Sequence, residues 1–115
     1  MSCAIIDAKL GIERAFGSAD IWRRAITELI VELPGLLADI ENAFTEKRFE
    51  DLRLHVHKLH GESIYCGTSM LQSRAKALEL ACLNTPNKIR ARLKELKLAV
   101  ATFAAFVDAN GIPEI

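Results

Sequence analysis

The sequence predicts an all-α fold, an antiparallel up-down four-helix bundle with a short additional N-terminal helix. Apolar residues recur at steps of three and four along almost the whole chain, which is the spacing of one helix face. Aromatic and β-branched residues are sparse, and no stretch alternates as a half-buried strand does. The connections between the apolar stripes are short, and helices joined by short connections pack most simply as antiparallel neighbours.

The first two helices are each expected to begin at a capping residue. A short opening helix is expected over about residues 7–16, with Asp7 as its N-cap. Ser18 is expected to cap a long second helix, whose apolar stripe consists of Trp22, Ile26, Leu29, Leu33, Leu36, Ile40 and Phe44. Pro34 interrupts this stripe without changing its phase, so we expect one kinked helix rather than two. Residues 45–48 are expected to form the turn that follows.

The third and fourth helices are expected on either side of a glycine. The third helix is expected from about Phe49 to Cys66, and its core stripe consists of Leu52, Val56, Leu59, Ser63 and Cys66. Gly67 is a natural terminator for it. Thr68 or Ser69 can then cap the fourth helix, whose stripe consists of Leu71, Ala75, Leu78 and Cys82.

The last helix is expected to follow a turn at residues 84–86. Thr85 is its expected cap, and Pro86 suits the first helical position, where the missing N–H does no harm. Its apolar stripe, which we assign to the core, ends before Asn110 and consists of Ile89, Leu93, Leu96, Val100, Phe103 and Val107.

Length and composition limit the function classes. A chain of 115 residues fits one domain, residues 1–115, and is too short to hold an ATP-binding catalytic domain as well. Fifteen basic residues balance fifteen acidic ones, which gives no support for a nucleic-acid binder. No apolar run approaches the ~18 residues of a membrane span, and the N-terminus does not resemble a signal peptide. Three widely spaced cysteines, Cys3, Cys66 and Cys82, suggest reduced thiols and a cytoplasmic location.

The segment His57-Lys58-Leu59-His60-Gly61 carries the most specific signal. Glycine inside a helix costs roughly 1 kcal/mol relative to alanine, so Gly61 needs a reason. A helical side chain leans toward the N-terminus, and a side chain at position 61 would therefore lean over the turn that carries His57. His57 also lies one residue past a core position, about 100° around the helix. We therefore expect a partly exposed imidazole that another molecule can approach closely; the alternative is a solvated surface histidine without a role.

A metal site is not expected at the histidines. His55 and His57 lie about 200° apart on a helix, so they cannot share one ion. His57 and His60 together supply only two ligands, and structural or catalytic metal sites need more.

The spacing from His57 onward resembles the histidine phosphotransfer (HPt) domain family. The pattern is His57-x-Leu59-x-Gly61, followed by Gly67 and then by Leu71. It looks closest to the HPt domain at the C-terminal end of hybrid sensor histidine kinases of the BarA/GacS type. The resemblance implies that His57 accepts a phosphoryl group on Nε2 from the aspartyl phosphate of a receiver domain and passes it to another. It implies no kinase activity and no cofactor of the chain's own, with Mg²⁺ on the partner receiver domain.

The resemblance also suggests which residues surround a phosphate on this histidine, namely Arg53, Lys58, His60, Gly61 and Glu79. His60 stands where the family often has lysine, which leaves Arg53 and Lys58 as the fixed positive charges. Glu79 can accept a hydrogen bond from Nδ1–H of the imidazole and leave Nε2 free as nucleophile; alternatively it is an ordinary solvated glutamate.

Apolar residues near the histidine suggest a docking patch for a receiver domain, formed by Ile21, Leu54 and Ile64. The alternative is partial burial under the opening helix. Glu62 stands where the family commonly has a small residue, which adds negative charge.

The expected partners are response regulator receiver domains, including those of a hybrid sensor kinase, and not nucleic acid or the membrane itself. We expect a monomer in the cytoplasm, at the cytoplasmic face of the inner membrane if the chain is part of a sensor kinase. The alternative function is a helical adaptor that binds a partner protein without accepting phosphate.

Overall fold

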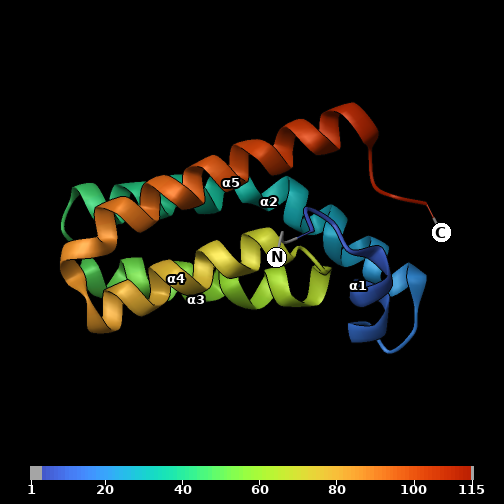
Figure 1. The fold of residues 1–115 in the computed structure, drawn as a ribbon, viewed down its shortest axis with the longest axis horizontal. Helices are drawn as coiled ribbons and strands as arrows, with labels where there is room; N and C mark the ends of the chain where they lie inside the picture. Colours follow the sequence, from blue (N-terminus) through green and yellow to red (C-terminus); the bar gives the residue numbers. More distant parts are fainter. Residues whose placement is uncertain (1–3, 115) are drawn as a thin grey trace.

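The chain folds as a helical bundle, and the computed structural model describes its residues 4–114, among which no strand occurs. The elements are α1 (Ala8–Arg14), α2 (Ala19–Thr45), α3 (Phe49–Cys66), α4 (Ser69–Asn84), the short 3₁₀ helix η1 (Pro86–Lys88) and α5 (Ile89–Asn110). Helices α2 to α5 pack in sequence order, each on the one before, and α1 packs on α2 and α3 at one end (Figure 1). The predicted four-helix bundle with an extra N-terminal helix is confirmed.

Helix α2 is a single helix that continues past Pro34. The Oγ atom of Ser18 accepts a hydrogen bond from the backbone N–H of Ile21 at 3.2 Å, as a capping serine should. The helix then runs without a break to Thr45, with Pro34 inside it. Pro34 lies on the exposed side of the helix. The sequence expectation of one long helix rather than two is therefore confirmed.

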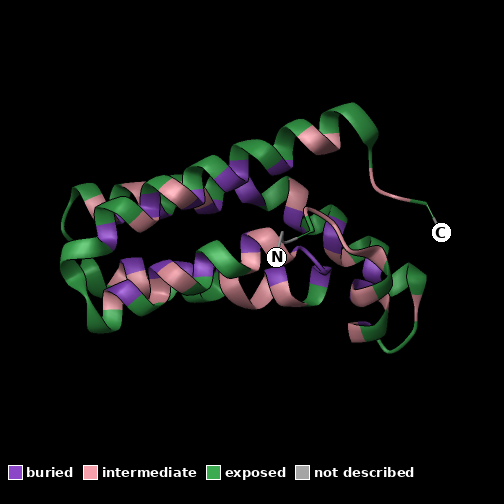
Figure 2. Cartoon of the chain, viewed as in Figure 1, coloured by how far each residue is buried: buried purple, intermediate pink, exposed green. Residues whose placement is uncertain are grey.

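The core lies between α2, α3, α4 and α5, which together carry most of the buried residues (Figure 2). Three predicted core residues are only half-buried: Phe44, Cys82 and Val107. Each lies in the last turn of its helix, where the bundle offers fewer neighbours. Ala43 and Ala81, the residues that precede Phe44 and Cys82, are buried.

The junction of α1 with α3 is tightly packed. Gly67 ends α3 in the left-handed conformation, with φ of 70°, as the sequence predicts. A Cβ atom at this position would collide with the backbone oxygen of Asp7 and would lie 2.8 Å from the backbone nitrogen of Gly11. Trp22 is buried beside it and donates a hydrogen bond from Nε1 to the backbone oxygen of Cys66 at 2.8 Å. The two backbones approach this closely only because Gly67 and Gly11 have no side chains.

Some helix ends differ from the sequence expectation. Helix α1 ends at Arg14, and Phe16 adopts a left-handed conformation and is 93% exposed. Thr68 precedes α4 but does not cap it, because its buried hydroxyl donates to the backbone oxygen of Ser63 at 3.0 Å, at the end of α3. Thr85 makes no capping hydrogen bond either. At Thr68, a carbonyl group left free at the end of α3 competes with capping for the hydroxyl.

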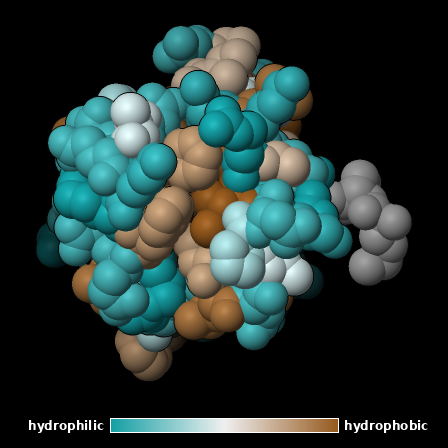
Figure 3. Space-filling model, turned by 90° about the vertical axis from the view of Figure 1, so that its left-hand side faces the viewer, coloured by the Kyte–Doolittle hydropathy of each residue, from teal (hydrophilic) through white to brown (hydrophobic). Residues whose placement is uncertain are grey.

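The opposite end of the bundle carries the α2–α3 and α4–α5 connections. Figure 3 faces this end and shows apolar side chains in a shallow hollow among polar ones. The α2–α3 connection lines this hollow with Phe44 and Phe49, and the α4–α5 connection lines it with Pro86 and Ile89. It lies at the end of the molecule away from α1.

Two further expectations concern the whole chain. Within residues 4–114, no helix combines the length and the apolar character needed to cross a membrane. Cys66 and Cys82 both carry free thiols, as expected, whereas Cys3 lies outside the described residues. Burial raises the pKa of Cys66 to about 12, so this thiol is an inert part of the core.

Candidate functional site

His57 stands on the outer surface of α3, about midway along the helix. Its neighbours in the core stripe, Val56 and Leu59, are fully buried, while the His57 side chain is 66% exposed. One turn later, a Cβ atom at Gly61 would meet nothing within 4 Å. The expectation of an accessible imidazole beside an open patch agrees with this placement.

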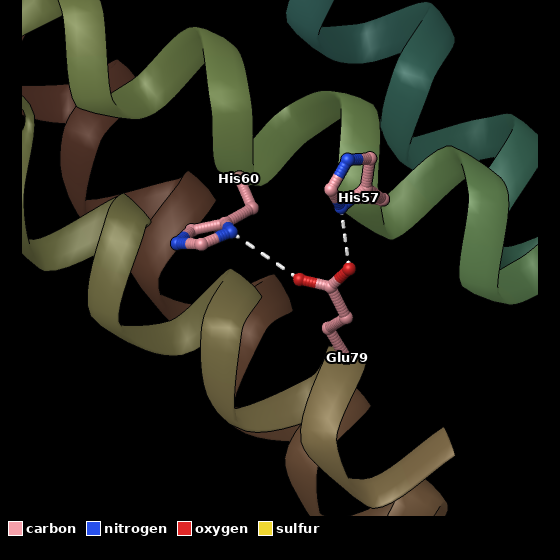
Figure 4. A group of neighbouring side chains, drawn as sticks. All are labelled: His57, His60 and Glu79. Atoms are coloured by element: carbon pink, nitrogen blue, oxygen red, sulfur yellow. Dashed lines mark hydrogen bonds and ion pairs between the residues drawn. The ribbon is translucent and has the colours of Figure 1, made fainter. Parts of the chain in front are cut away.

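Glu79 projects from α4 toward two histidines of α3 (Figure 4). Its Oε2 atom lies 2.5 Å from Nδ1 of His57, and its Oε1 atom lies 3.2 Å from Nδ1 of His60. Glu79 and His60 are largely shielded from solvent, with side chains 14% and 16% exposed, whereas His57 is open. The contact between Glu79 and His57 that the sequence allowed is therefore present, and His60 joins the same carboxylate.

The contact with Glu79 decides which nitrogen of His57 carries the proton. An ionised carboxylate only accepts hydrogen bonds, so Nδ1 of His57 must be the donor. In the neutral ring Nε2 then keeps its lone pair. Nε2 lies on the side of the ring away from Glu79 (Figure 4) and makes no hydrogen bond within residues 4–114. A nucleophilic nitrogen therefore faces solvent.

The fixed positive charges flank His57. Arg53, one turn earlier on α3, pairs with Glu50 through contacts of 2.6 and 3.3 Å. This hydrogen bonding raises the pKa of Arg53, and the charge of Glu79 adds to the effect. Lys58 is exposed on the other side of His57. Both cations that the sequence named are close to the imidazole along the helix, and their roles stay predictions.

Glu62 does not face the imidazole. It lies toward α2, in a cleft that Glu28 and Glu32 also line. Its Oε2 atom is buried and has no hydrogen-bond partner among the described residues. Burial, and then the neighbouring carboxylate of Glu32, raise the pKa of Glu62. The negative charge that departs from the family pattern is thus directed away from Glu79 and His57, which meet on the α4 side of α3.

The predicted docking residues differ in exposure. Ile21 and Leu54 are each 51% exposed, whereas Ile64 is half-buried. The backbone oxygen of Ile64 accepts a hydrogen bond from Arg14 of α1 at 2.7 Å. Ile64 is therefore partly buried beside α1, which was the alternative to a docking role.

Sequence reasoning missed two exposed aromatic residues. Tyr65 on α3 is 61% exposed, and Phe16 lies in the turn between α1 and α2. Tyr65 was available to the same helix-face reasoning, because it lies two turns and about 80° from His57. Phe16 gave no such signal, since the apolar pattern placed it inside the opening helix.

The number of possible metal ligands was underestimated from the sequence. His57, His60 and Glu79 each offer one ligand atom, and these atoms all lie within 4.8 Å of one another. The count of two considered only α3, and α4 supplies the third. His55 is half-buried and lies outside this group.

Comparison with known proteins identifies the family of this chain. The Hpt domain family matches residues 24–108, from the second turn of α2 to near the end of α5. The sensor histidine kinase GacS of Pseudomonas protegens is 28% identical over 106 residues, which cover 92% of this chain and 12% of that protein. No solved structure matches the chain significantly. Because the family match includes His57, Gly61 and Glu79 and most of the bundle, the chain belongs to the Hpt domain family.

Proposed function

We propose that this chain relays a phosphoryl group between the aspartates of receiver domains through His57. Membership of the Hpt family and the likeness to a sensor histidine kinase already make it a phosphotransfer domain of two-component signalling. The observation that carries the finer proposal is the exposed Nε2 atom of His57, whose ring is held through Nδ1–H by Glu79.

The chemical step follows from that geometry. The lone pair of Nε2 attacks the phosphorus of an aspartyl phosphate on a receiver domain. A nitrogen–phosphorus bond forms, and the phosphorus–oxygen bond to the aspartate breaks with its electron pair going to the leaving carboxylate. No proton has to leave Nε2 first, because the ring proton is on Nδ1. The reverse step, to the aspartate of a second receiver, uses the same atoms.

Glu79 acts as a positioning residue in this scheme. The phosphorylated imidazole carries a proton on Nδ1 and shares positive ring charge, which the adjacent carboxylate stabilises. The same contact fixes the orientation of the ring, so that Nε2 points outward before a partner arrives. Positioning of this kind is most of what phosphoryl transfer requires from a protein scaffold.

The partner supplies the rest of the machinery. A receiver domain docks over Gly61, beside Leu54 and Ile21, and brings the Mg²⁺ ion and the acidic site, so that the chain needs no cofactor of its own. The chain spans 12% of the length of the sensor histidine kinase that it matches. A role as one domain of a longer sensor kinase is therefore part of the same proposal. The reaction takes place in the cytoplasm, where receiver domains are phosphorylated.

The test is transfer from radiolabelled receivers. Each purified receiver domain of the source organism is phosphorylated with a small phosphodonor and mixed with the chain in Mg²⁺. We expect an acid-labile, base-stable label that His57→Gln abolishes and that His55→Gln retains in full; His60→Gln should retain part of it. Label on the His57→Gln variant would refute the assignment of the site.

The adaptor alternative gives a different result in the same experiment. A non-catalytic adaptor would bind a receiver domain equally well with and without the His57→Ala substitution. It would accept label from none of the receiver domains. Binding is measured by titration calorimetry with the unphosphorylated receiver.

A further inference from the structure

We propose that His57, His60 and Glu79 form a binding site for a transition-metal cation such as Zn²⁺, and that the bound ion blocks phosphoryl acceptance. The blocking half rests on the proposed function above, whereas the binding half does not. The ion would be an inhibitor and not a cofactor of the transfer.

The donor atoms are those that Zn²⁺ prefers. Two imidazole nitrogens and one carboxylate oxygen form a ligand set known from zinc proteins, with a fourth position left for water. Imidazole nitrogens favour Zn²⁺, Cu²⁺ or Ni²⁺ over Mg²⁺, which prefers oxygen ligands. The Mg²⁺ of a partner receiver therefore would not compete for this group.

The geometry needs little adjustment to accept the ion. Tetrahedral ligands about 2.0–2.1 Å from Zn²⁺ lie roughly 3.3 Å apart. Nδ1 of His60 already lies 3.2 Å from Oε1 of Glu79, while Nδ1 of His57 lies 2.5 Å from Oε2. His57 is the exposed member and can withdraw by rotating its side chain, so an ion can enter between the three groups. His60 and Glu79 are already shielded and face each other across α3 and α4.

Metal binding at Nδ1 changes the chemistry at Nε2. In the metal-free ring the proton is on Nδ1, and Nε2 has the lone pair that attacks phosphorus. An ion bound to Nδ1 uses the lone pair there, so the single proton of the neutral ring moves through solvent to Nε2. No proton is gained or lost overall, but Nε2 becomes an N–H group and is no longer a nucleophile. One ion therefore both occupies Glu79 and disables the acceptor atom.

Two other hollows on the surface have no comparable set of ligand atoms. The cleft beside α2 offers the three carboxylates of Glu28, Glu32 and Glu62 and no imidazole, and the unpartnered Oε2 atom there belongs to a residue that is only half-buried. The groove between α2 and α5, lined by Phe44, Leu93 and Leu98 among others, has nothing that indicates what covers it.

Binding is tested first, without any receiver. The chain is freed of metal with a chelator and titrated with ZnCl₂ by calorimetry, and with CoCl₂ by visible absorption. We expect one ion per chain and the absorption bands of tetrahedral Co²⁺. His60→Gln and Glu79→Gln should each weaken Zn²⁺ binding at least roughly tenfold, as loss of a ligand does. His55→Gln is the matched control on the same helix and should change nothing.

The tautomer gives a second, independent readout. A two-dimensional ¹H–¹⁵N spectrum of the imidazoles should show the His57 proton on Nδ1 in the metal-free protein and on Nε2 after Zn²⁺ is added. Absence of saturable binding, equal affinity in His60→Gln, or an unchanged tautomer would each overturn the site.

Transfer is then measured with and without Zn²⁺. Zn²⁺ should slow labelling of the wild-type chain at least tenfold and leave the labelling rate of His60→Gln unchanged. Both proteins contain His57 and are mixed with the same receiver. Equal slowing of both would place the effect on the receiver and overturn the block. If Zn²⁺ binds as expected while no receiver labels the chain, the proposed function fails and the metal site stands.

Discussion

Gly61 lies inside α3 and Gly67 directly follows the end of this helix, and their surroundings are opposite. Beside Gly67 a Cβ atom would strike the backbone of the segment that leads into α1, and the residue holds a left-handed conformation. Beside Gly61 a Cβ atom would touch nothing, and the backbone is an ordinary α-helix. The first glycine closes a junction within the molecule. The second leaves room beside an exposed imidazole for another molecule.

A glycine in or at the end of a helix is therefore not by itself a sign of function. Gly67 and Gly11 are needed for close packing around Trp22, which any bundle with this N-terminal helix requires. Gly61 has no packing reason within residues 4–114, so a role in contact with another molecule remains as an explanation. An approaching receiver domain is the proposal that fits.

The largest effect is expected from Gly67→Ala. The new methyl group collides with backbone atoms of Asp7 and Gly11, and the residue must also hold a left-handed conformation. We expect a loss of roughly 2–4 kcal/mol of unfolding free energy, measured by urea denaturation. Gly17→Ala is the matched control, because Gly17 also has positive φ but open space around it. It should cost only about 1 kcal/mol. Equal losses would show that the tight contact does not matter.

The next effect concerns transfer and not stability. Gly61→Leu has room in the folded chain and should leave the bundle intact or stabilise it by up to about 1 kcal/mol. The added side chain covers the approach to His57, so labelling from a receiver should slow at least tenfold, or about 1.4 kcal/mol in the barrier. The labelling rate of Gly61→Ala should lie between those of the wild type and Gly61→Leu.

A control for added apolar surface is available on α5. Ala105 is exposed on α5, which does not pack on α3, so Ala105→Leu should leave the labelling rate unchanged. If Gly61→Leu is labelled as fast as the wild type, Gly61 does not provide access to His57. Gly61 and Gly67 would then differ in packing but not in function.

The smallest effect tests the other face of α3. The raised pKa of Glu62 means that folding favours its protonated form. Its contribution is therefore most favourable at low pH and is lost as pH rises from the unfolded-state value through the folded-state value. Glu62→Gln should raise the melting temperature at pH 7 by roughly 1–4 °C. The gain should vanish at low pH, where the carboxyl is protonated in both states.

Glu13→Gln, on the exposed face of α1, removes the same charge without burial and should shift the melting temperature less. Labelling of Glu62→Gln should match the wild type, because Glu62 lies on the α2 side of α3. A gain that grows toward low pH would contradict the direction of the pKa shift.

The sequence alone determined the helices and the accessible histidine. Local rules decide these features: the three-and-four spacing of apolar residues, Ser18 as a cap and Gly67 as a helix end all act within a few residues. The exposure of His57 followed as well, because one step past a buried position turns a side chain about 100° outward. Sequence rules were less accurate at Phe16 and Thr68, where turn and hydroxyl geometry depend on neighbouring backbone.

Only the tertiary structure decided what surrounds the imidazole. Glu79 lies 22 residues from His57 in the chain, and only the packing of α4 on α3 sets its carboxylate between His57 and His60. The same packing turned two possible ligands into three and left Glu62 on the opposite edge of α3. Helical periodicity fixes the direction of a side chain around its own helix, whereas distances between helices depend on how whole faces fit together.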